Sequence, residues 1–198
     1  MEIVSPNTAG LIQTADALKA GKIVAYPTES VYGLGVDPFN AEALESLYRV
    51  KGRDESNPVL MIVSNKDQLK RVVEDITPKA QQAMKAFWPG PLSILFPAKA
   101  DLSELLLGKN DKVCVRLTSH PIAEALCRVF DGPIVSTSAN LYSQNPAKSA
   151  QEIDLDGVAV CIDGGIANQK SSTVFEPDSG TVLREGSISR IDIANALF

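Results

Sequence analysis

Short runs of apolar residues, separated by polar segments that contain glycine or proline, recur along the whole chain. Runs of this length that are rich in Val and Ile are typical of buried β-strands. The first run, Ile23-Val24-Ala25-Tyr26, is stopped by Pro27. The pattern predicts strands over residues 23–26, 31–36, 59–63, 93–96, 112–117, 134–137, 158–162, 173–175 and 182–184.

Between several of these runs, apolar residues recur at helical spacing. Thr8 is a candidate cap for a first helix, which Gly21 would end. Asn40 is the candidate cap of a second helix, with Gly52 at its end. Further helices are predicted from Asn65, from Thr77-Pro78 to Phe87, from near Pro121, and from a capping box formed by Ser149 and Glu152.

Strands interleaved with helices predict an α/β fold, and the hairpin-like spacing near the C-terminus predicts that its twisted sheet is mixed and flanked by helices. The length of 198 residues fits one domain over residues 1–198. Hydrophobic residues make up 44% and charged residues 22%, so the chain can bury a sizeable core. This composition excludes a disordered or fibrous protein.

The formal net charge of −5 argues against a surface that binds nucleic acid mainly by counterion release. It leaves room for a local basic pocket. The N-terminus lacks a basic stretch followed by an apolar run, and no segment approaches the length of a membrane span. We therefore expect a soluble, unexported protein that does not contact a membrane.

Cysteine and histidine usage narrows the chemistry further. The three cysteines, Cys114, Cys127 and Cys161, form no Cys-x-x-Cys pair, so neither a disulfide framework nor a zinc site is predicted. This usage fits a reducing cytoplasm. His120 is the only histidine, so Ser-His or Cys-His catalysis would depend on it alone. We expect it to face solvent.

The usual phosphate-binding and hydrolase signatures are absent. Neither Gly21-Lys22 nor Gly108-Lys109 has the upstream glycine and the following Ser or Thr of a Walker-type loop. The sequence also contains no Gly-x-Gly-x-x-Gly after its first strand and no Gly-x-Ser-x-Gly. A P-loop enzyme, a dinucleotide fold and an α/β-hydrolase are therefore not indicated.

Polar stretches instead follow several predicted strands, where an open α/β sheet usually presents its ligand site. In residues 27–35, Thr28 could offer its hydroxyl to a ligand, although a simple turn is the alternative. The short polar side chains of residues 136–140 could surround an anion or a ribose, or cap a helix. Residues 171–173 again place hydroxyl groups beside a strand.

Cations accompany these stretches. Lys51 and Arg53 suit a polyphosphate, because Arg offers a planar fork and Lys a mobile point charge. The alternative is a basic helix C-terminus stabilised by the helix dipole. Arg116 lies between apolar strand residues and needs a partner if buried, either a ligand carboxylate or an internal salt bridge. Arg184 follows another apolar run.

Taken together and in this order, these blocks resemble the YrdC/Sua5 family. The resemblance runs from about Thr8 to Ile188, and its markers are PTESVYGLG, Lys-x-Arg, WPGPLS, VCVRLTSHP, STSAN, SSTV and REG. It implies a single YrdC-like domain with a concave, positively charged ligand site. It also implies condensation of L-threonine, bicarbonate and ATP to L-threonylcarbamoyl-adenylate and pyrophosphate, with Mg²⁺ bound mainly through ATP.

The resemblance further implies roles for particular residues. Lys51 and Arg53 would stabilise the leaving pyrophosphate and are the catalytic candidates. L-threonine would be bound by Thr28, Arg116 and Ser172, and ATP by Lys51, Arg53, Ser138, Asn140 and Arg184. No residue is assigned to a metal. A separate enzyme complex would then transfer the product's threonylcarbamoyl group to adenosine 37 of ANN-decoding tRNAs.

The chain departs from the family pattern at Asp54, at Ile62 and over residues 141–144, where threonine contacts and the nucleotide-facing loop are expected to differ. Three alternative interpretations of the sequence stay open. The same basic concavity could serve an RNA-binding or ribosome-maturation module with weak RNA affinity, a paralogue without synthase activity, or a domain that handles carbamoyl phosphate.

Overall fold

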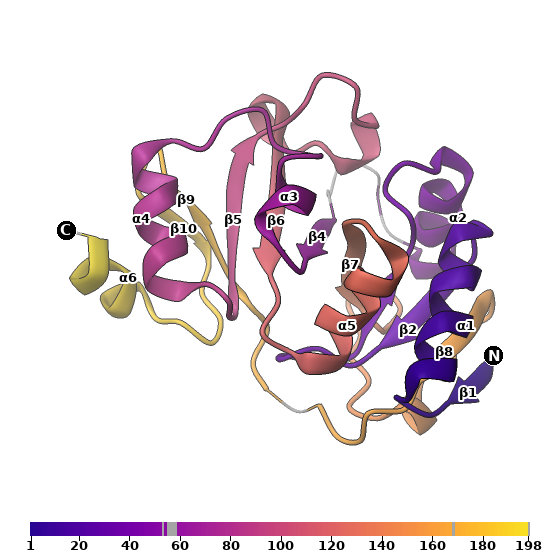
Figure 1. The fold of residues 1–198 in the computed structure, drawn as a ribbon. Helices are drawn as coiled ribbons and strands as arrows, with labels where there is room; N and C mark the ends of the chain where they lie inside the picture. Colours follow the sequence, from indigo (N-terminus) through magenta and orange to yellow (C-terminus); the bar gives the residue numbers. More distant parts are fainter. Residues whose placement is uncertain (53, 55–58, 168, 198) are drawn as a thin grey trace.

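Strands from both halves of the chain form one mixed sheet in the computed structural model, which describes residues 1–52, 54, 59–167 and 169–197 (Figure 1). The ten strands lie in the order β1-β8-β2-β3-β7-β4-β6-β5-β9-β10. They are β1 (Glu2–Val4), β2 (Ile23–Tyr26), β3 (Gly33–Gly35), β4 (Leu60–Val63), β5 (Leu92–Pro97), β6 (Lys112–Leu117), β7 (Ile134–Ser138), β8 (Val158–Ile162), β9 (Thr173–Glu176) and β10 (Thr181–Arg184).

The helices begin and end at residues whose chemistry favours a boundary. The Asn40 side chain accepts a hydrogen bond from the Ala43 amide, and Gly52 ends the helix with a φ of 58°, a left-handed conformation that glycine adopts without strain. The helices are α1 (Thr8–Lys19), α2 (Ala41–Lys51), α3 (Lys66–Leu69), α4 (Pro78–Phe87), α5 (Pro121–Phe130) and α6 (Arg190–Leu197).

The apolar side chains form two clusters. In one, Ala15 and Leu18 of α1 pack with Leu126 of α5 and with buried residues of β2 and β8. The larger cluster packs α2, α3, α4 and α6 against the sheet, and it includes other residues of the same two strands, such as Ala25 of β2 and Cys161 of β8. Figure 1 shows the same division, with α1 beside α5 and α4 beside α6. The helices thereby fix the strands whose ends carry the polar motifs.

Most predicted elements are confirmed, several within one residue at either end. Residues 23–26, 112–117 and 158–162 are strands with the predicted bounds. The predicted strand over residues 31–36 is shorter, Gly33–Gly35. The cap of α1 is Asn7, not Thr8, because the Asn7 side chain accepts from the Gly10 amide.

Three differences concern whole elements. The helix predicted from Ser149 is a single 3₁₀ turn, Ala150–Glu152, in which the Glu152 carboxylate accepts from the Lys148 amide and Ser149 makes no side-chain cap. The strand β1 and the helix α6 were not predicted. β1 has only three residues and pairs with β8 alone, so its local signal is weak.

Gly35 shows how tightly β3 packs. A Cβ atom there would lie 2.7 Å from Cε1 of Tyr26 and 2.8 Å from Cγ2 of Ile134. Gly35→Ala is therefore expected to lower the midpoint of thermal unfolding by about 5 °C, since overpacking costs about 1–3 kcal/mol. Gly132→Ala is the control, because its Cβ would meet movable side-chain atoms of Phe130 and Arg71 at 3.1 and 3.3 Å. Equal midpoints for the two variants would contradict this packing account.

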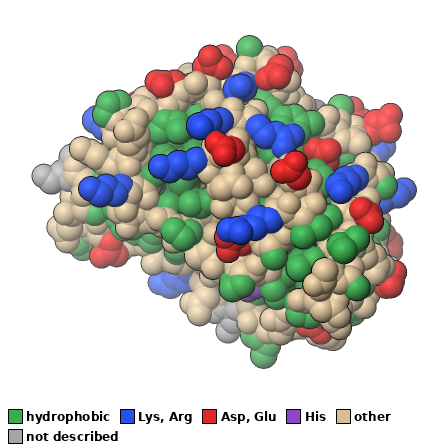
Figure 2. All heavy atoms as spheres, viewed as in Figure 1, with side chains coloured by type: hydrophobic (Ala, Val, Ile, Leu, Met, Phe, Trp, Pro, Cys, Tyr) green, Lys and Arg blue, Asp and Glu red, His purple; other side chains and the backbone are tan. Residues whose placement is uncertain are grey.

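The surface seen in Figure 2, on the same side as the view in Figure 1, mixes Lys and Arg with Asp and Glu, with apolar side chains between them. This face presents no continuous basic area. Within the described part of the chain, no helix is both long enough and apolar enough to cross a bilayer.

Candidate active site

One large cavity, of about 820 Å³, lies where strands from both halves of the sheet meet. The antiparallel register of β3 and β7 sets Gly33 opposite Ser138, and β4 sets Leu60 beside both Cys114 of β6 and Ser136 of β7. Five predicted site residues line this cavity: Thr28, Arg116, Ser138, Ser172 and Arg184.

Arg116 is the most buried cation of the cavity lining, with its side chain 3% exposed. Its Nε lies 3.1 Å from Oε1 of Glu29. Neither atom has a hydrogen-bond partner among the described residues. The contact is therefore an ion pair. Nη1 of Arg116 is 3.5 Å from Oγ of Ser30, at the limit of a weak hydrogen bond.

Thr28 closes a compact turn at the edge of the cavity. Its hydroxyl donates to the carbonyl oxygen of Val31 at 2.7 Å and accepts from the Ser30 amide at 3.1 Å. Its Oγ1 also lies 3.0 Å from the hydroxyl oxygen of Ser30. Thr28 thus helps to place Ser30, a lining residue that the sequence interpretation missed.

Ser172 contacts a serine of β5 and the guanidinium of Arg184 in β10. Its hydroxyl lies 2.9 Å from that of Ser93 in β5. Arg184 donates to the carbonyl oxygen of Ser172 from Nη2 at 3.0 Å and to the Ser172 hydroxyl at 3.2 Å. The structure therefore brings the predicted threonine-site serine into direct contact with a predicted ATP-site arginine.

Lys51 and Asn140 lie beside the cavity, outside its described lining. The Lys51 ammonium donates to the carbonyl oxygens of Ser138 and Asn140 at 2.6 and 2.8 Å. The side-chain amide of Asn140 donates to the backbone carbonyl oxygens of Leu141 and Gln144. Lys51 therefore fixes the loop that carries Ser138. Arg53 lies outside the described residues, as does most of the segment after it.

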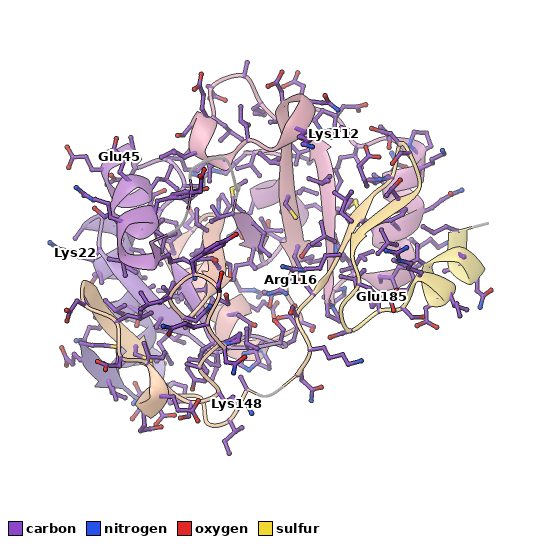
Figure 3. All side chains as sticks on the ribbon, turned by 180° about the vertical axis from the view of Figure 1, so that it is seen from behind. Lys22, Glu45, Lys112, Arg116, Lys148 and Glu185 are labelled. Atoms are coloured by element: carbon purple, nitrogen blue, oxygen red, sulfur yellow. The ribbon has the colours of Figure 1, made fainter. Side chains whose placement is uncertain are left out.

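The far end of the cavity carries charges that the sequence interpretation did not assign. Lys112 of β6, which is labelled in Figure 3, contacts the carboxylates of Glu176 and Asp178. Burial alone would lower the pKa of Lys112, but the hydrogen bonds to Asp178 and Glu176 raise it above its ordinary value. The pKa of Glu176 is lowered: burial opposes the shift, and the hydrogen bonds from Lys112 and Ser179 cause it. This rim therefore pairs one ammonium group with two carboxylates.

His120 does not face solvent as expected. It is half-buried, and its Nδ1 is buried without a hydrogen-bond partner among the described residues. Burial lowers its pKa, and the nearby Glu29 carboxylate partly offsets that effect. The backbone amide of His120 donates to the Thr118 hydroxyl, which itself donates to the Glu29 carboxylate.

Cys114 lines the cavity but is poorly activated. Burial raises the pKa of its thiol to about 11, despite the opposing effects of Arg184, Arg116 and Ser93. Because the thiolate is the reactive form, we expect iodoacetamide to label Cys114 at pH 7.5 about 100-fold more slowly than free cysteine. The labelling rate should rise about tenfold per pH unit up to pH near 11. Peptide mapping by mass spectrometry measures this rate, and rapid labelling at pH 7.5 would refute the buried environment.

The described residues contain no group of three or more His, Cys, Asp or Glu side chains able to hold a metal ion. The two carboxylates of the described cavity lining, Glu176 and Asp178, are already paired with Lys112.

Comparison with known proteins defines the class. The Sua5/YciO/YrdC family model, described as "Telomere recombination", matches residues 16–186. The chain therefore belongs to this family of α/β domains. A relative from Aliivibrio fischeri, named threonylcarbamoyl-AMP synthase, is 37% identical over an alignment of 182 residues that covers 89% of this chain and 98% of the relative. A Methylococcus capsulatus protein of the same name is 44% identical over 135 residues, 68% of this chain and 73% of the relative.

Solved structures agree with this assignment. P. abyssi Sua5 complexed with L-threonine superposes with a TM-score of 0.91 at 30% identity, covering 99% of this chain. This chain spans 59% of that protein's length. E. coli YciO superposes with a TM-score of 0.81 over 93% of this chain and 94% of its own, at 24% identity, which supports the fold alone. The predicted family and the predicted α/β fold with a mixed sheet are confirmed.

Proposed function

We propose that this protein is a threonylcarbamoyl-AMP synthase, which condenses L-threonine, bicarbonate and ATP to L-threonylcarbamoyl-adenylate, pyrophosphate and water. The observation that carries the proposal is the buried Arg116 at a cavity shared with Thr28, Ser138, Ser172 and Arg184. Two curated relatives of this name match the chain over 98% of their own length, and a solved relative was crystallised with L-threonine.

In this proposal Arg116 binds the carboxylate of L-threonine, because a guanidinium offers paired N–H donors to the two carboxylate oxygens. Thr28 and Ser172 supply hydroxyl groups beside it. The site suits the carboxylate because burial strengthens the charge interaction.

ATP occupies the rest of the cavity as its Mg²⁺ complex, with the metal held mainly by phosphate oxygens. Arg184 and Ser138 contact the nucleotide, while Lys51, Arg53 and Asn140 surround the phosphates. Lys51 contributes through its charge and through the loop that it fixes by its bonds to the carbonyl oxygens of Ser138 and Asn140.

The chemistry proceeds in two steps. The threonine amine first adds bicarbonate with loss of water, giving an N-carboxy group. The oxygen of that carboxylate then attacks the α-phosphorus, and the bond to the β-phosphate oxygen breaks, releasing pyrophosphate. Lys51 and Arg53 stabilise the charge on the leaving group. Such transfer depends mainly on alignment and on cations, which fits a cavity built from arginines and hydroxyls.

The product would serve a separate complex that modifies adenosine 37 of ANN-decoding tRNAs. Since both ATP and tRNA are substrates of that sequence of reactions, we place this protein in the cytoplasm. Its three free cysteines are compatible with that compartment.

A pyrophosphate-release assay tests the proposal. Release should require L-threonine, bicarbonate and MgATP together, and mass spectrometry should detect threonylcarbamoyl-adenylate. Serine in place of threonine is the specificity control. Absence of release, combined with RNA binding that weakens steeply with salt, would replace the synthase by an RNA-binding module.

A further inference from the structure

We propose that Glu29 is a positioning residue, which holds the Arg116 guanidinium so that its remaining N–H groups face the cavity. This inference rests on the proposed role of Arg116 as the site of the threonine carboxylate. Glu29 lies in the polar stretch after β2, next to Thr28, but no role was predicted for it from the sequence.

Glu29 is itself held firmly. Its Oε2 accepts a hydrogen bond from the Thr118 hydroxyl at 2.8 Å, while its Oε1 lies 3.1 Å from Nε of Arg116. The Glu29 side chain is 11% exposed. Thr118 is buried, and its own backbone amide donates to the carbonyl oxygen of Val63 in β4. The carboxylate is therefore anchored through β4 and the end of β6, two rigid parts of the sheet.

The carboxylate approaches Arg116 from the side away from the cavity. Arg116, Thr28 and Ser30 line the cavity, whereas Glu29 is not part of its described lining. Glu29 faces Nε, whereas Nη1 of Arg116 lies 3.5 Å from Oγ of Ser30, a residue of the cavity lining. A guanidinium has two edges that can bind a carboxylate, so a partner at Nε leaves the Nη edge for a ligand.

A second role for Glu29 must be separated from positioning. A carboxylate beside a buried arginine also neutralises its charge, which stabilises the fold but weakens the attraction for a substrate carboxylate. Loss of charge alone would leave threonine binding unchanged or stronger. Loss of orientation would weaken it, because a misplaced donor pair no longer meets both ligand oxygens. The two roles therefore predict opposite changes in the affinity for threonine.

Glu29→Gln and Glu29→Ala separate these roles. Glutamine keeps an oxygen that can face Nε and an amide that can reach the Thr118 hydroxyl, but it carries no charge. We expect the KM for threonine to stay within about threefold of wild type in Glu29→Gln and to rise about 30-fold or more in Glu29→Ala, the range typical of losing an oriented charge pair. The KM for ATP should change by less than about twofold in both, as for a residue without nucleotide contact.

Thr118 provides a second test if Glu29→Ala does not fold. Thr118→Val removes the anchoring hydroxyl and leaves both charges in place, so the KM for threonine should rise about fivefold, the effect of one lost hydrogen bond. Thr118→Ser should restore it. Glu124→Gln is the matched control, because Glu124 pairs with Arg128 at 2.6 Å on the exposed face of α5.

The outcomes are distinguishable. A threonine KM that falls in both Glu29→Gln and Glu29→Ala would show that Glu29 acts through its charge and not through orientation. Unchanged threonine KM values in Glu29→Ala and Thr118→Val would remove Glu29 from the site altogether. Either result overturns the inference while the wild-type activity stands. If the wild type shows no threonine-dependent pyrophosphate release, the proposed function fails instead, and calorimetric titration of L-threonine alone into the same variants decides the role of Glu29.

Discussion

Arg116→Met is expected to lower threonine-dependent pyrophosphate release, measured as kcat/KM for threonine, by about 1,000-fold. In the proposed complex, Arg116 and the threonine carboxylate form a buried, hydrogen-bonded charge pair. Removing one partner of such a pair costs about 2–5 kcal/mol, and about 1.4 kcal/mol corresponds to a factor of ten. The loss should appear mainly in KM for threonine, because the substrate carboxylate is bound before the chemistry.

Two further variants make this result interpretable. Arg116→Met also leaves Glu29 without its partner, so thermal unfolding must show that the variant remains folded. Arg116→Lys keeps the charge but not the planar fork, and a loss of about 30-fold is expected. Arg128→Met on the exposed face of α5 is the control and should retain wild-type kinetics. A threonine KM close to wild type in Arg116→Met would end the assignment.

Lys51→Ala is expected to lower the rate of pyrophosphate release at saturating substrates by about 100-fold, the typical effect of removing one important charged stabiliser. The variant loses a charge beside the phosphates and the two bonds to the carbonyl oxygens of Ser138 and Asn140. The change should appear in kcat and in KM for ATP, with the threonine KM little affected.

Lys66→Ala serves as the control, because Lys66 is an exposed residue of α3 outside the described cavity lining. Lys51 is nearly fully buried, so unfolding must be measured alongside. Lys51→Arg separates the charge of the side chain from its bonds to the loop. The variant keeps the charge, but its larger head group does not fit the same pair of carbonyl oxygens. Near-normal turnover in Lys51→Ala would exclude Lys51 from the leaving-group role.

Elements with strong local signals could be predicted from the sequence. The Asn40 cap and Gly52 define α2 without reference to the rest of the chain. The Ser149–Glu152 pair shows the limit of such reasoning, because Glu152 binds the Lys148 amide and the segment turns only once before β8. A capping pattern alone does not provide an apolar face to bury, and most helical stability comes from that burial.

The sequence motifs predicted residues of the candidate site, but not the contacts between residues that lie on different strands. Thr28, Arg116, Ser138, Ser172 and Arg184 lie in separate segments, and the cavity that they share follows from strand order. Glu29 was within a recognised motif, but its contact with Arg116 depends on where β6 lies in the sheet. The Lys112–Glu176 contact joins residues 64 positions apart and depends on β5 lying between β6 and β9. Such pairings are not readable from local pattern.

The central claim is that one cavity holds L-threonine and ATP side by side. A crystal structure with L-threonine and a non-hydrolysable ATP analogue with Mg²⁺ tests it most directly. We predict the threonine carboxylate on the Nη edge of Arg116 and the nucleotide against Ser138 and Arg184, with the threonine amine facing the α-phosphate. Ligands in separate cavities, or a threonine carboxylate bound away from Arg116, would contradict the account.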